Sequence, residues 1–372
     1  MRWNEPAPSE RAAGERSWHV VCAAWEARSP QPRPRRNRGR LVAIAVALLI
    51  VAAILSPPGL AVLGSIRDAV STKTTRDELR SLPAPGRLLV DAPAGIWVVQ
   101  ADGSKRFLSG YLDASWSPHG LYLAAAHGNE LVAMEPNGKL HWTLARSRPI
   151  GAPRWSFEGY RIAYLSGPAL RVVNGDGTGD HLIAGDVVGV GLPAFAWRPA
   201  THELAYKNRS GMIVMRDVDR NVRLWQRRAH GVERLLWSDD GRRLYVAGTP
   251  AFVLDARADL VAAVPSTPSA TFRPHGHALA VATAAHGRTS VVVYSGRGYG
   301  ERRTVFSAPG VFGGLAWSPD GRWLLVDWRS ADEWIFIRST GARRVITAPN
   351  ISNTFRTSRE APPAIAGWCC TD

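Results

Sequence analysis

The chain has 372 residues, of which 45% are hydrophobic and 21% are charged, so it holds ample apolar material for a packed core. A length of this size corresponds to two or three average domains, or to one large repeat domain. The formal net charge of +15 favours a protein that works next to anionic surfaces or polymers, and it excludes an acidic chain.

Residues 1–40 form the first segment, which we expect to be a cytoplasmic tail. Frequent prolines and scattered charges there predict disorder over most of its length. One stretch, residues 9–28, has a helical pattern of apolar side chains and predicts a short amphipathic helix. Its face would dock a cytoplasmic protein or lie on the inner leaflet, unless the spacing is a coincidence. The four residues of this face are Trp18, Val21, Cys22 and Trp25.

A basic cluster and a long apolar run follow the tail. Five arginines lie between Arg33 and Arg40, and the uncharged stretch from Leu41 to Ile66 has 26 residues, more than the roughly 20 that span a bilayer. We therefore predict an uncleaved transmembrane helix over 41–63 rather than a buried core helix. The arginines place the N-terminus in the cytoplasm and the rest of the protein outside the plasma membrane. Residues 64–86, with mixed charges and prolines, are expected to be a stalk.

From residue 87 onward the chain repeats one pattern, a short apolar strand that ends in an aromatic residue and is followed by a polar turn and a second strand. In its clearest copy, Trp317-Ser-Pro-Asp-Gly321, proline favours the first corner of a tight turn and glycine accepts a left-handed backbone. We call the aromatic residue of each copy its anchor. The anchors are Trp116, Trp155, Trp197, Trp237, Phe272, Trp317 and Trp368.

The first six anchors recur at intervals of about 40 residues, as expected for four-stranded propeller blades. Residues 87–108 supply three strands without an anchor, whereas Ala364–Trp368 supplies an anchor strand without a blade. Joining the two ends predicts an all-β, seven-bladed propeller over 87–372, with a six-bladed ring as the alternative. In its Trp-Ser-Pro-Asp-Gly turns the chain resembles the TolB-type, WD-repeat-like β-propellers. That resemblance implies a fold and says little about function.

Several polar features of the sequence are candidate chemical sites. Three turn histidines, at positions 119, 275 and 277, are expected to be solvated. The stretch Asn174–Asp180 alternates oxygen-bearing side chains with glycines, which suits either a calcium loop or an ordinary hairpin turn. The adjacent Cys369 and Cys370 form a thiol pair that is compatible with a vicinal disulfide, two free thiols or links to a partner.

Motifs for catalysis or cofactor binding were not found in the sequence. It has no Gly-x-Ser-x-Gly elbow, no Walker loop and no zinc-type Cys/His spacing. We therefore predict a non-catalytic binding, scaffold or sensor module without cofactor, metal or nucleic acid, whose partner is a protein or an anionic envelope polymer. A relay to a cytoplasmic partner through the tail would fit this role. The alternative is a quinone-type cofactor enzyme, because Leu131–Trp142 and Met215–Trp225 faintly resemble the repeats of such propellers and because of the cysteine pair.

Overall fold

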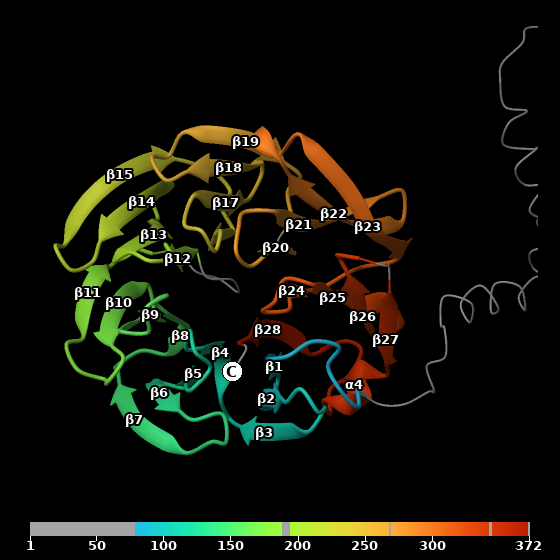
Figure 1. The fold of residues 1–372 in the computed structure, drawn as a ribbon. Helices are drawn as coiled ribbons and strands as arrows, with labels where there is room; N and C mark the ends of the chain where they lie inside the picture. Colours follow the sequence, from blue (N-terminus) through green and yellow to red (C-terminus); the bar gives the residue numbers. More distant parts are fainter. Residues whose placement is uncertain (1–78, 188–193, 268, 342–343, 371–372) are drawn as a thin grey trace, which may run out of the picture. The chain divides into compact units, whose positions relative to one another are not determined.

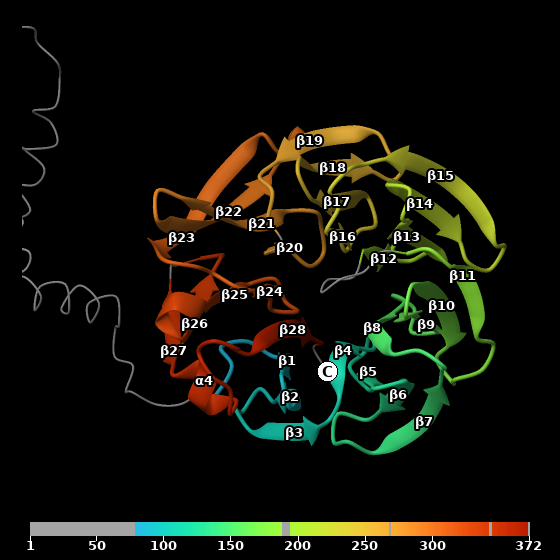
Figure 2. The same ribbon diagram turned by 180° about the vertical axis from the view of Figure 1, so that it is seen from behind.

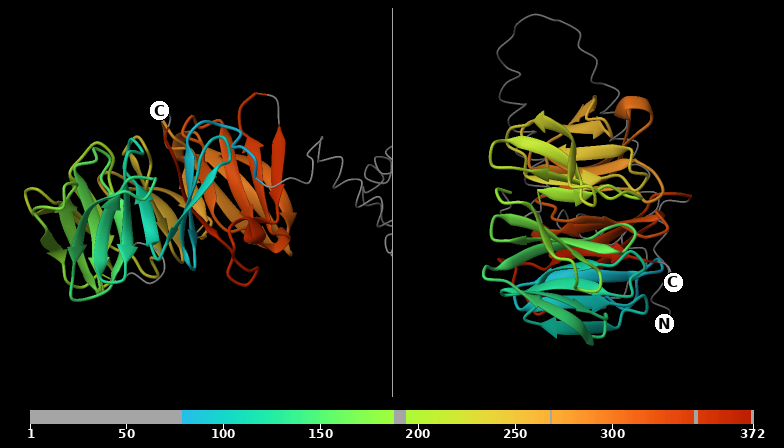
Figure 3. Two further views of the ribbon diagram at one scale, coloured as in Figure 1. Left: turned by 90° about the horizontal axis from the view of Figure 1, so that it is seen from below. Right: turned by 90° about the vertical axis from the view of Figure 1, so that its left-hand side faces the viewer.

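The computed structural model describes residues 79–187, 194–267, 269–341 and 344–370. In this part of the chain, seven four-stranded antiparallel sheets are arranged as the blades of a ring (Figures 1 and 2). The first strand of each blade lies towards the centre and the fourth at the rim. The side views in Figure 3 show the blades standing side by side with their hairpin turns on two opposite faces.

The blades are numbered from the one that contains both ends of the repeat region. Blade 1 consists of β28 (Ala364–Cys369), β1 (Arg87–Ala92), β2 (Gly95–Val99) and β3 (Lys105–Ser109). Blade 2 consists of β4 (Leu112–Trp116), β5 (Leu123–His127), β6 (Glu130–Met134) and β7 (Leu140–Ala145). Blade 3 consists of β8 (Ile150–Trp155), β9 (Arg161–Ser166), β10 (Ala169–Asn174) and β11 (His181–Ala184).

The other four blades follow in chain order. Blade 4 consists of β12 (Phe195–Trp197), β13 (Glu203–Lys207), β14 (Met212–Asp217) and β15 (Val222–Arg228). Blade 5 consists of β16 (Arg234–Trp237), β17 (Arg243–Ala247), β18 (Ala251–Asp255) and β19 (Leu260–Val264). Blade 6 consists of β20 (Ala270–Phe272), β21 (Leu279–Ala285), β22 (Arg288–Ser295), η1 (Arg297–Tyr299) and β23 (Glu301–Pro309). Blade 7 consists of β24 (Leu315–Trp317), β25 (Trp323–Trp328), η2 (Arg329–Ala331), β26 (Glu333–Arg338) and β27 (Val345–Pro349), followed by α4 (Ile351–Thr354).

The turn after each anchor explains the residue types of the repeat. In blade 7, the Ser318 amide donates to the Trp323 carbonyl at 2.8 Å, and the Ser318 hydroxyl accepts from the Trp323 amide at 2.9 Å. The Asp320 carboxylate accepts from the Arg322 amide at 3.0 Å, and Gly321 has a φ of 63°. Serine and aspartate therefore satisfy backbone donors within the turn, and glycine provides the left-handed corner without strain.

Two copies depart from the expected use of glycine. In blades 4 and 6 the left-handed residues are Ala200 (φ 56°) and His275 (φ 60°), one position before the place that glycine takes elsewhere. The expectation that glycine takes this corner is thus wrong for the Phe272 copy, although that copy contains Gly276. Both hairpins keep the same length, because the backbone bond that closes them joins the same relative positions, as Arg273 N to the carbonyl oxygen of Ala278 at 2.8 Å shows.

The ring closes within blade 1. Strand β28 pairs with β1 in an antiparallel register that places Trp368 opposite Leu88. The Trp368 side chain is 8% exposed, its indole meets the Phe336 ring edge-on at 5.8 Å, and its Nε1 donates to the Pro85 carbonyl at 3.2 Å. The predicted blade built from both ends of the repeat region is confirmed, and the six-bladed alternative is wrong. Closure leaves no unpaired inner strand in the ring.

The core lies between neighbouring blades, and residues ahead of β1 contribute to it. Leu79 and Leu82 are buried in the same cluster as Trp334 of blade 7. The Leu82 amide donates to the Ala101 carbonyl at 2.9 Å, and Lys105 Nζ donates to the Leu79 carbonyl at 3.0 Å. The last residues of the predicted stalk therefore pack on blade 1 as part of the domain.

The predicted tail, transmembrane helix and first part of the stalk (1–78) lie outside the described residues, as does the proposed docking face at Trp18, Val21, Cys22 and Trp25. Within the described ranges, no helix has the length and apolar character needed to cross a bilayer.

Candidate functional site

The seven anchors all lie at the end of an innermost strand. Six are the last residues of β4, β8, β12, β16, β20 and β24, and Trp368 is the last but one residue of β28. The turns that follow the first six anchors therefore lie together on one face of the ring, which we call the anchor face. Because successive strands alternate in direction, the turns between third and fourth strands lie on the same face.

Two neighbouring anchor turns, those of blades 2 and 3, differ from the others in what they expose. Leu121 and Tyr122 are 61% and 37% exposed, and Phe157 and Tyr160 are 48% and 70% exposed. The fifth residue after the anchor is apolar or aromatic only in these two blades. At that position blades 4 to 7 carry His202, Arg242, His277 and Arg322. One sector of the anchor face is thus aromatic and aliphatic, whereas the same positions elsewhere are basic or imidazole side chains.

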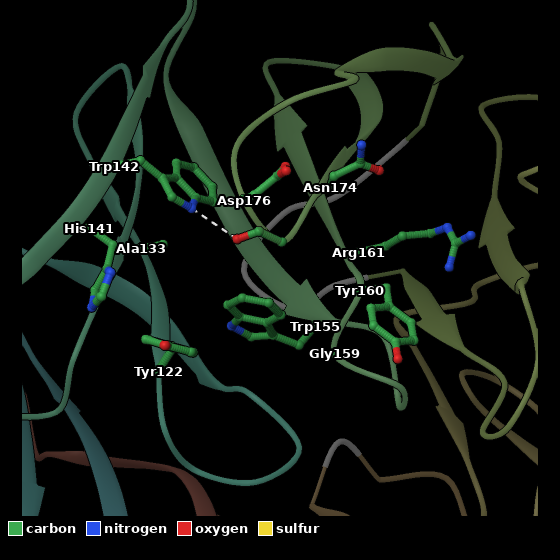
Figure 4. A pocket seen from close by; sticks show the side chains of 11 residues that line it. Tyr122, Ala133, His141, Trp142, Trp155, Gly159, Tyr160, Arg161, Asn174 and Asp176 are labelled. Atoms are coloured by element: carbon green, nitrogen blue, oxygen red, sulfur yellow. Dashed lines mark hydrogen bonds between the residues drawn. The ribbon is translucent and has the colours of Figure 1, made fainter.

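Between these two turns lies a groove of about 670 Å³. Blade 2 contributes the end of its anchor turn, the third strand β6 and the start of the fourth strand β7, and blade 3 contributes the end of β8, its anchor turn and the turn after β10 (Figure 4). In Figure 4, Trp155 lies between Tyr122 on one side and Tyr160 on the other. The lining residues are Tyr122, Ala133, His141, Trp142, Trp155, Gly159, Tyr160, Arg161, Asn174, Gly175 and Asp176.

The aromatic walls of the groove are held in place by specific contacts. Trp142 Nε1 donates to the Gly175 carbonyl at 2.9 Å, a bond drawn as a dashed line in Figure 4. The Tyr122 and His141 rings meet edge-on at 4.9 Å between centroids. Gly177 has a φ of 86°, and a Cβ at this position would approach the Trp142 ring to 2.9 Å. Only glycine lets the turn backbone pass so close to the indole.

Ionised side chains surround these rings. The Asp176 carboxylate accepts from the amide and the hydroxyl of Thr178, at 3.0 and 2.7 Å, and these bonds lower the pKa of Asp176 below its ordinary value. Arg161 forms an ion pair with Asp219 at 2.6 Å. Asp176 is therefore ionised at neutral pH at the mouth of the groove, and the Arg161 guanidinium lies along its wall.

His141, which lines the other side of the groove, bonds to Glu135 at 3.1 Å. Glu135 also pairs with Lys139 at 3.2 Å, and the hydrogen bonds from Lys139, His141 and Asn137 lower the pKa of Glu135. A second carboxylate is therefore ionised beside the groove, but it has its own cation.

The stretch Asn174–Asp180 forms a hairpin turn between β10 and β11. Its last carboxylate, Asp180, accepts from the Tyr164 hydroxyl at 2.6 Å and forms ion pairs with Arg146 and Arg171. Its oxygens are thus committed to cations of the protein. Among the described residues no group of three or more His, Cys, Asp or Glu side chains is placed to bind a metal ion.

Arginines that follow or face an anchor connect neighbouring blades, a feature that the sequence analysis missed. Each guanidinium lies over the anchor ring of the next blade, within 5.1 to 5.6 Å of its centroid, and donates to the carbonyl of that blade's turn glycine at 2.8 to 2.9 Å. The three pairs are Arg87 with Trp116, Arg198 with Trp237, and Arg273 with Trp317. Such pairs add a cation–π and a hydrogen-bond contribution to each boundary.

The turn histidines have two different roles. His119 and His275 have exposed side chains, as expected. His277 is not simply solvated, because its Nδ1 lies 2.7 Å from the Asp240 carboxylate of blade 5. The His275 amide likewise donates to Asp239 at 2.7 Å. Histidine and aspartate in corresponding turns therefore join blades 5 and 6, a pairing that appears only when the blades stand side by side.

Cys369 and Cys370 are joined as a vicinal disulfide at the boundary of blades 1 and 2. The Cys370 sulfur lies 3.1 Å from the Pro118 carbonyl oxygen, and the Cys369 sulfur lies 3.7 Å from that of Ser117. The pair thus sits against the blade 2 anchor turn. The remaining cysteine, Cys22, lies outside the described residues.

Charged residues of both signs on different blades influence one another. Asp113 and Arg154 lie on the innermost strands β4 and β8, and Asp91 lies on β1. Burial raises the pKa of Asp91 to about 6, against the opposing effect of the Arg154 charge. Burial also lowers the pKa of Arg234 to about 10, and repulsion by Arg154 adds to this. The Arg154 charge of blade 3 therefore acts on residues of two other blades, Asp91 in blade 1 and Arg234 in blade 5.

The sequence carried one usable signal for the groove. Leu121 and Tyr160 are apolar or aromatic at the position where the other turns carry His202, Arg242, His277 and Arg322, a difference that an alignment of the repeats reveals. The partners Trp142 and Asn174 belong to other strands of two different blades and have no such signal. They come together only through the placement of blade 2 beside blade 3.

Comparison with known proteins supports the fold alone. No protein-family model matches the chain, and no curated protein matches it in sequence. Among solved structures it is similar to a chain in the crystal structure of the mitotic checkpoint complex, with a TM-score of 0.52 and 19% identity over 68% of this chain and 90% of that one. It is also similar to the β-propeller domain of Cps50 (Swd1) from Myceliophteria thermophila, with a TM-score of 0.50 and 12% identity over 70% of this chain and 89% of that one. These likenesses support a WD-repeat-like β-propeller fold.

Proposed function

We propose that this protein is a membrane-tethered, non-catalytic binding module of the TolB-like type, which holds its propeller outside the plasma membrane and captures a protein partner on the anchor face. One observation carries the proposal, namely the exposed sector of Leu121, Tyr122, Phe157 and Tyr160 around the groove between blades 2 and 3. Tyrosine and tryptophan dominate the binding energy of protein interfaces. A cluster of exposed apolar side chains on a soluble domain marks an interaction surface.

The rigid ring favours binding over catalysis at this sector. The groove walls are fixed by hydrogen bonds and ring contacts, so a partner meets a surface that is already organised and loses less entropy on binding. The ionisable side chains around the rings have partners, His141 in Glu135, Asp176 in Thr178 and Arg161 in Asp219, an arrangement that favours recognition over proton transfer.

Membrane tethering is the second part of the proposal and rests on the apolar run 41–63 with its arginine flank. Protease added to intact cells stripped of their wall should remove the propeller. It should leave a membrane-bound fragment of about 70 residues that contains the tail and the transmembrane helix. A propeller that is fully protected from the protease would contradict this topology. The cytoplasmic tail would then relay partner binding through Trp18, Val21, Cys22 and Trp25.

The binding role is tested by crosslinking partners to the tagged full-length protein in cells. Tyr122→Ala combined with Tyr160→Ala should remove the crosslinked partner, because both side chains are exposed at the groove and neither supports the core. Leu260→Ala is the matched control, since that side chain is 59% exposed on the rim of blade 5. Equal crosslinking by the double variant and the control would refute a partner site at this sector.

A further inference from the structure

The charges around the groove differ from those of the chain as a whole. The chain carries +15, whereas the ionised groups that line the groove or bond to its lining are two cations and three carboxylates, a net charge of −1 (2 − 3). Arg161 and Asp176 line the groove, Glu135 and Asp219 bond to the lining residues His141 and Arg161, and Lys139 is counted with them because it pairs with Glu135. The groove is therefore a locally acidic site on a basic protein and disfavours an anionic ligand.

One of these carboxylates has no cation of its own. Glu135 pairs with Lys139, and Asp219 pairs with Arg161. Asp176 has as partners only the amide and hydroxyl of Thr178 within the described ranges, and it is ionised at neutral pH. A negative charge thus stands uncompensated at the mouth of the groove, where Figure 4 shows it next to Trp142.

The walls next to that charge are aromatic rings. Trp142, Trp155, Tyr122 and Tyr160 line the groove, and apart from glycines Ala133 is the one aliphatic lining residue. The faces of tryptophan and tyrosine rings attract organic cations, and the attraction grows when the cation leaves water. Because the Trp142 ring is fixed by its bond to the Gly175 carbonyl, the wall is ready before a ligand arrives.

From this arrangement we propose that the groove receives the side chain of an arginine or lysine from the protein partner. The inference rests on the proposed function and names the chemistry that the partner presents. The cation would lie among the rings and face the Asp176 carboxylate. Leu121 and Phe157, exposed beside the groove, would contact apolar residues that flank the cation in the partner's chain. These flanking contacts favour a peptide segment over a lone choline headgroup or a saccharide.

The test uses two peptides that differ in charge and hardly in shape. An acetylated and amidated Gly-Leu-Arg-Leu-Gly peptide is titrated into the purified full-length protein, and binding is followed by calorimetry and by tryptophan fluorescence. The same peptide with citrulline in place of arginine keeps the planar side chain and loses the positive charge. We expect the arginine peptide to bind about tenfold more tightly than the citrulline peptide. Equal affinities, or no binding of either peptide, would overturn the proposal.

Variants assign the effect to the groove. Tyr160→Leu keeps an apolar side chain and removes the ring, so arginine-peptide affinity should fall about three- to fivefold, whereas Tyr160→Phe should leave it unchanged. Asp176→Asn keeps the oxygen that accepts from Thr178 and removes the charge, so affinity should fall by a similar factor and lose part of its salt dependence. Val311→Ala, exposed far along the chain on the loop before β24, is the control that should change nothing.

Two outcomes separate this inference from the proposed function. If the arginine peptide fails to bind while Tyr122→Ala with Tyr160→Ala still removes the crosslinked partner, the binding site stands and its preference for a cation is wrong. If an oligomer of N-acetylglucosamine binds in place of the peptide and with the same dependence on Tyr160, the site recognises a saccharide and the inference is overturned. If phosphatidylcholine vesicles bind and lose affinity in the Tyr160→Leu variant, the site recognises a lipid headgroup and the inference is likewise overturned.

Discussion

Removal of the C-terminal strand should open the ring. Strand β28 is the inner strand of blade 1 and joins the two ends of the repeat region. Deleting residues 364–372 leaves β1 without its partner along the register from Arg87 to Asp91 and removes Trp368 from its contact with Phe336. An unpaired inner edge then faces solvent in a ring that otherwise has all its inner strands paired.

The expected loss of stability can be divided into two parts. Truncation of a buried aromatic side chain costs about 3–5 kcal/mol, so Trp368→Ala alone should lower the melting temperature by about 6–10 °C. The deletion also removes the hydrogen bonds between β28 and β1, each worth about 1 kcal/mol. The sum approaches or exceeds the stability of a typical domain, which is about 5–15 kcal/mol. The full deletion should therefore abolish cooperative unfolding.

Circular dichroism melting and size-exclusion chromatography of the soluble fragment from residue 79 onward would measure this effect. The fragment that ends at 370 should melt cooperatively as a monomer, Trp368→Ala should melt at a lower temperature, and the fragment that ends at 363 should aggregate or melt broadly. Cys369→Ser with Cys370→Ser is the control, because it keeps the strand and removes the disulfide. If the shorter fragment melts within about 2 °C of the longer one, β28 does not hold the ring together and the reasoning fails.

Three further predictions concern single residues of the blades. Replacing Arg273 with Gln removes the cation over the Trp317 ring and should lower the free energy of unfolding in urea by about 1–2 kcal/mol. The raised pKa of Asp91, about 6 in the folded state against 3.8 in the unfolded chain, means that its stabilising effect is complete below pH 4 and is lost as the pH rises through 6. Asp91→Asn should therefore raise the melting temperature at pH 8 and change it little at pH 4, and an equal shift at both would contradict the assignment. Gly177→Ala forces a side chain towards Trp142 at a left-handed position and should cost about 1–3 kcal/mol, with a blue or red shift of tryptophan fluorescence as the local readout.

The features that could be predicted from sequence are those written within one hairpin. The bonds of Ser318 and Asp320 join residues at most five positions apart, so the same residue types recur wherever the hairpin recurs and reveal the blades. The sequence also predicted that the anchor strand at Trp368 completes the blade that begins at residue 87, because each of the two parts is incomplete alone. Contacts between blades have no such local code. The pairing of His277 with Asp240 depends on the orientation of side chains from different blades.

The difference between positions that the hairpin needs and positions that it does not need explains where a partner site can arise on this ring. In blade 7 the hydrogen bonds of the anchor turn use the side chains of the first and third residues after the anchor and the amides of the fourth, fifth and sixth, so none of them needs the side chain at the fifth position. That side chain can change without loss of the turn, as the series from Leu121 and Tyr160 to Arg242 and Arg322 illustrates. In blades 2 and 3 the fifth positions are Leu121 and Tyr160, an apolar and an aromatic residue beside the groove between the two blades. Specificity can therefore change at the turns while the anchors and the strand pairing, which carry the stability, stay the same.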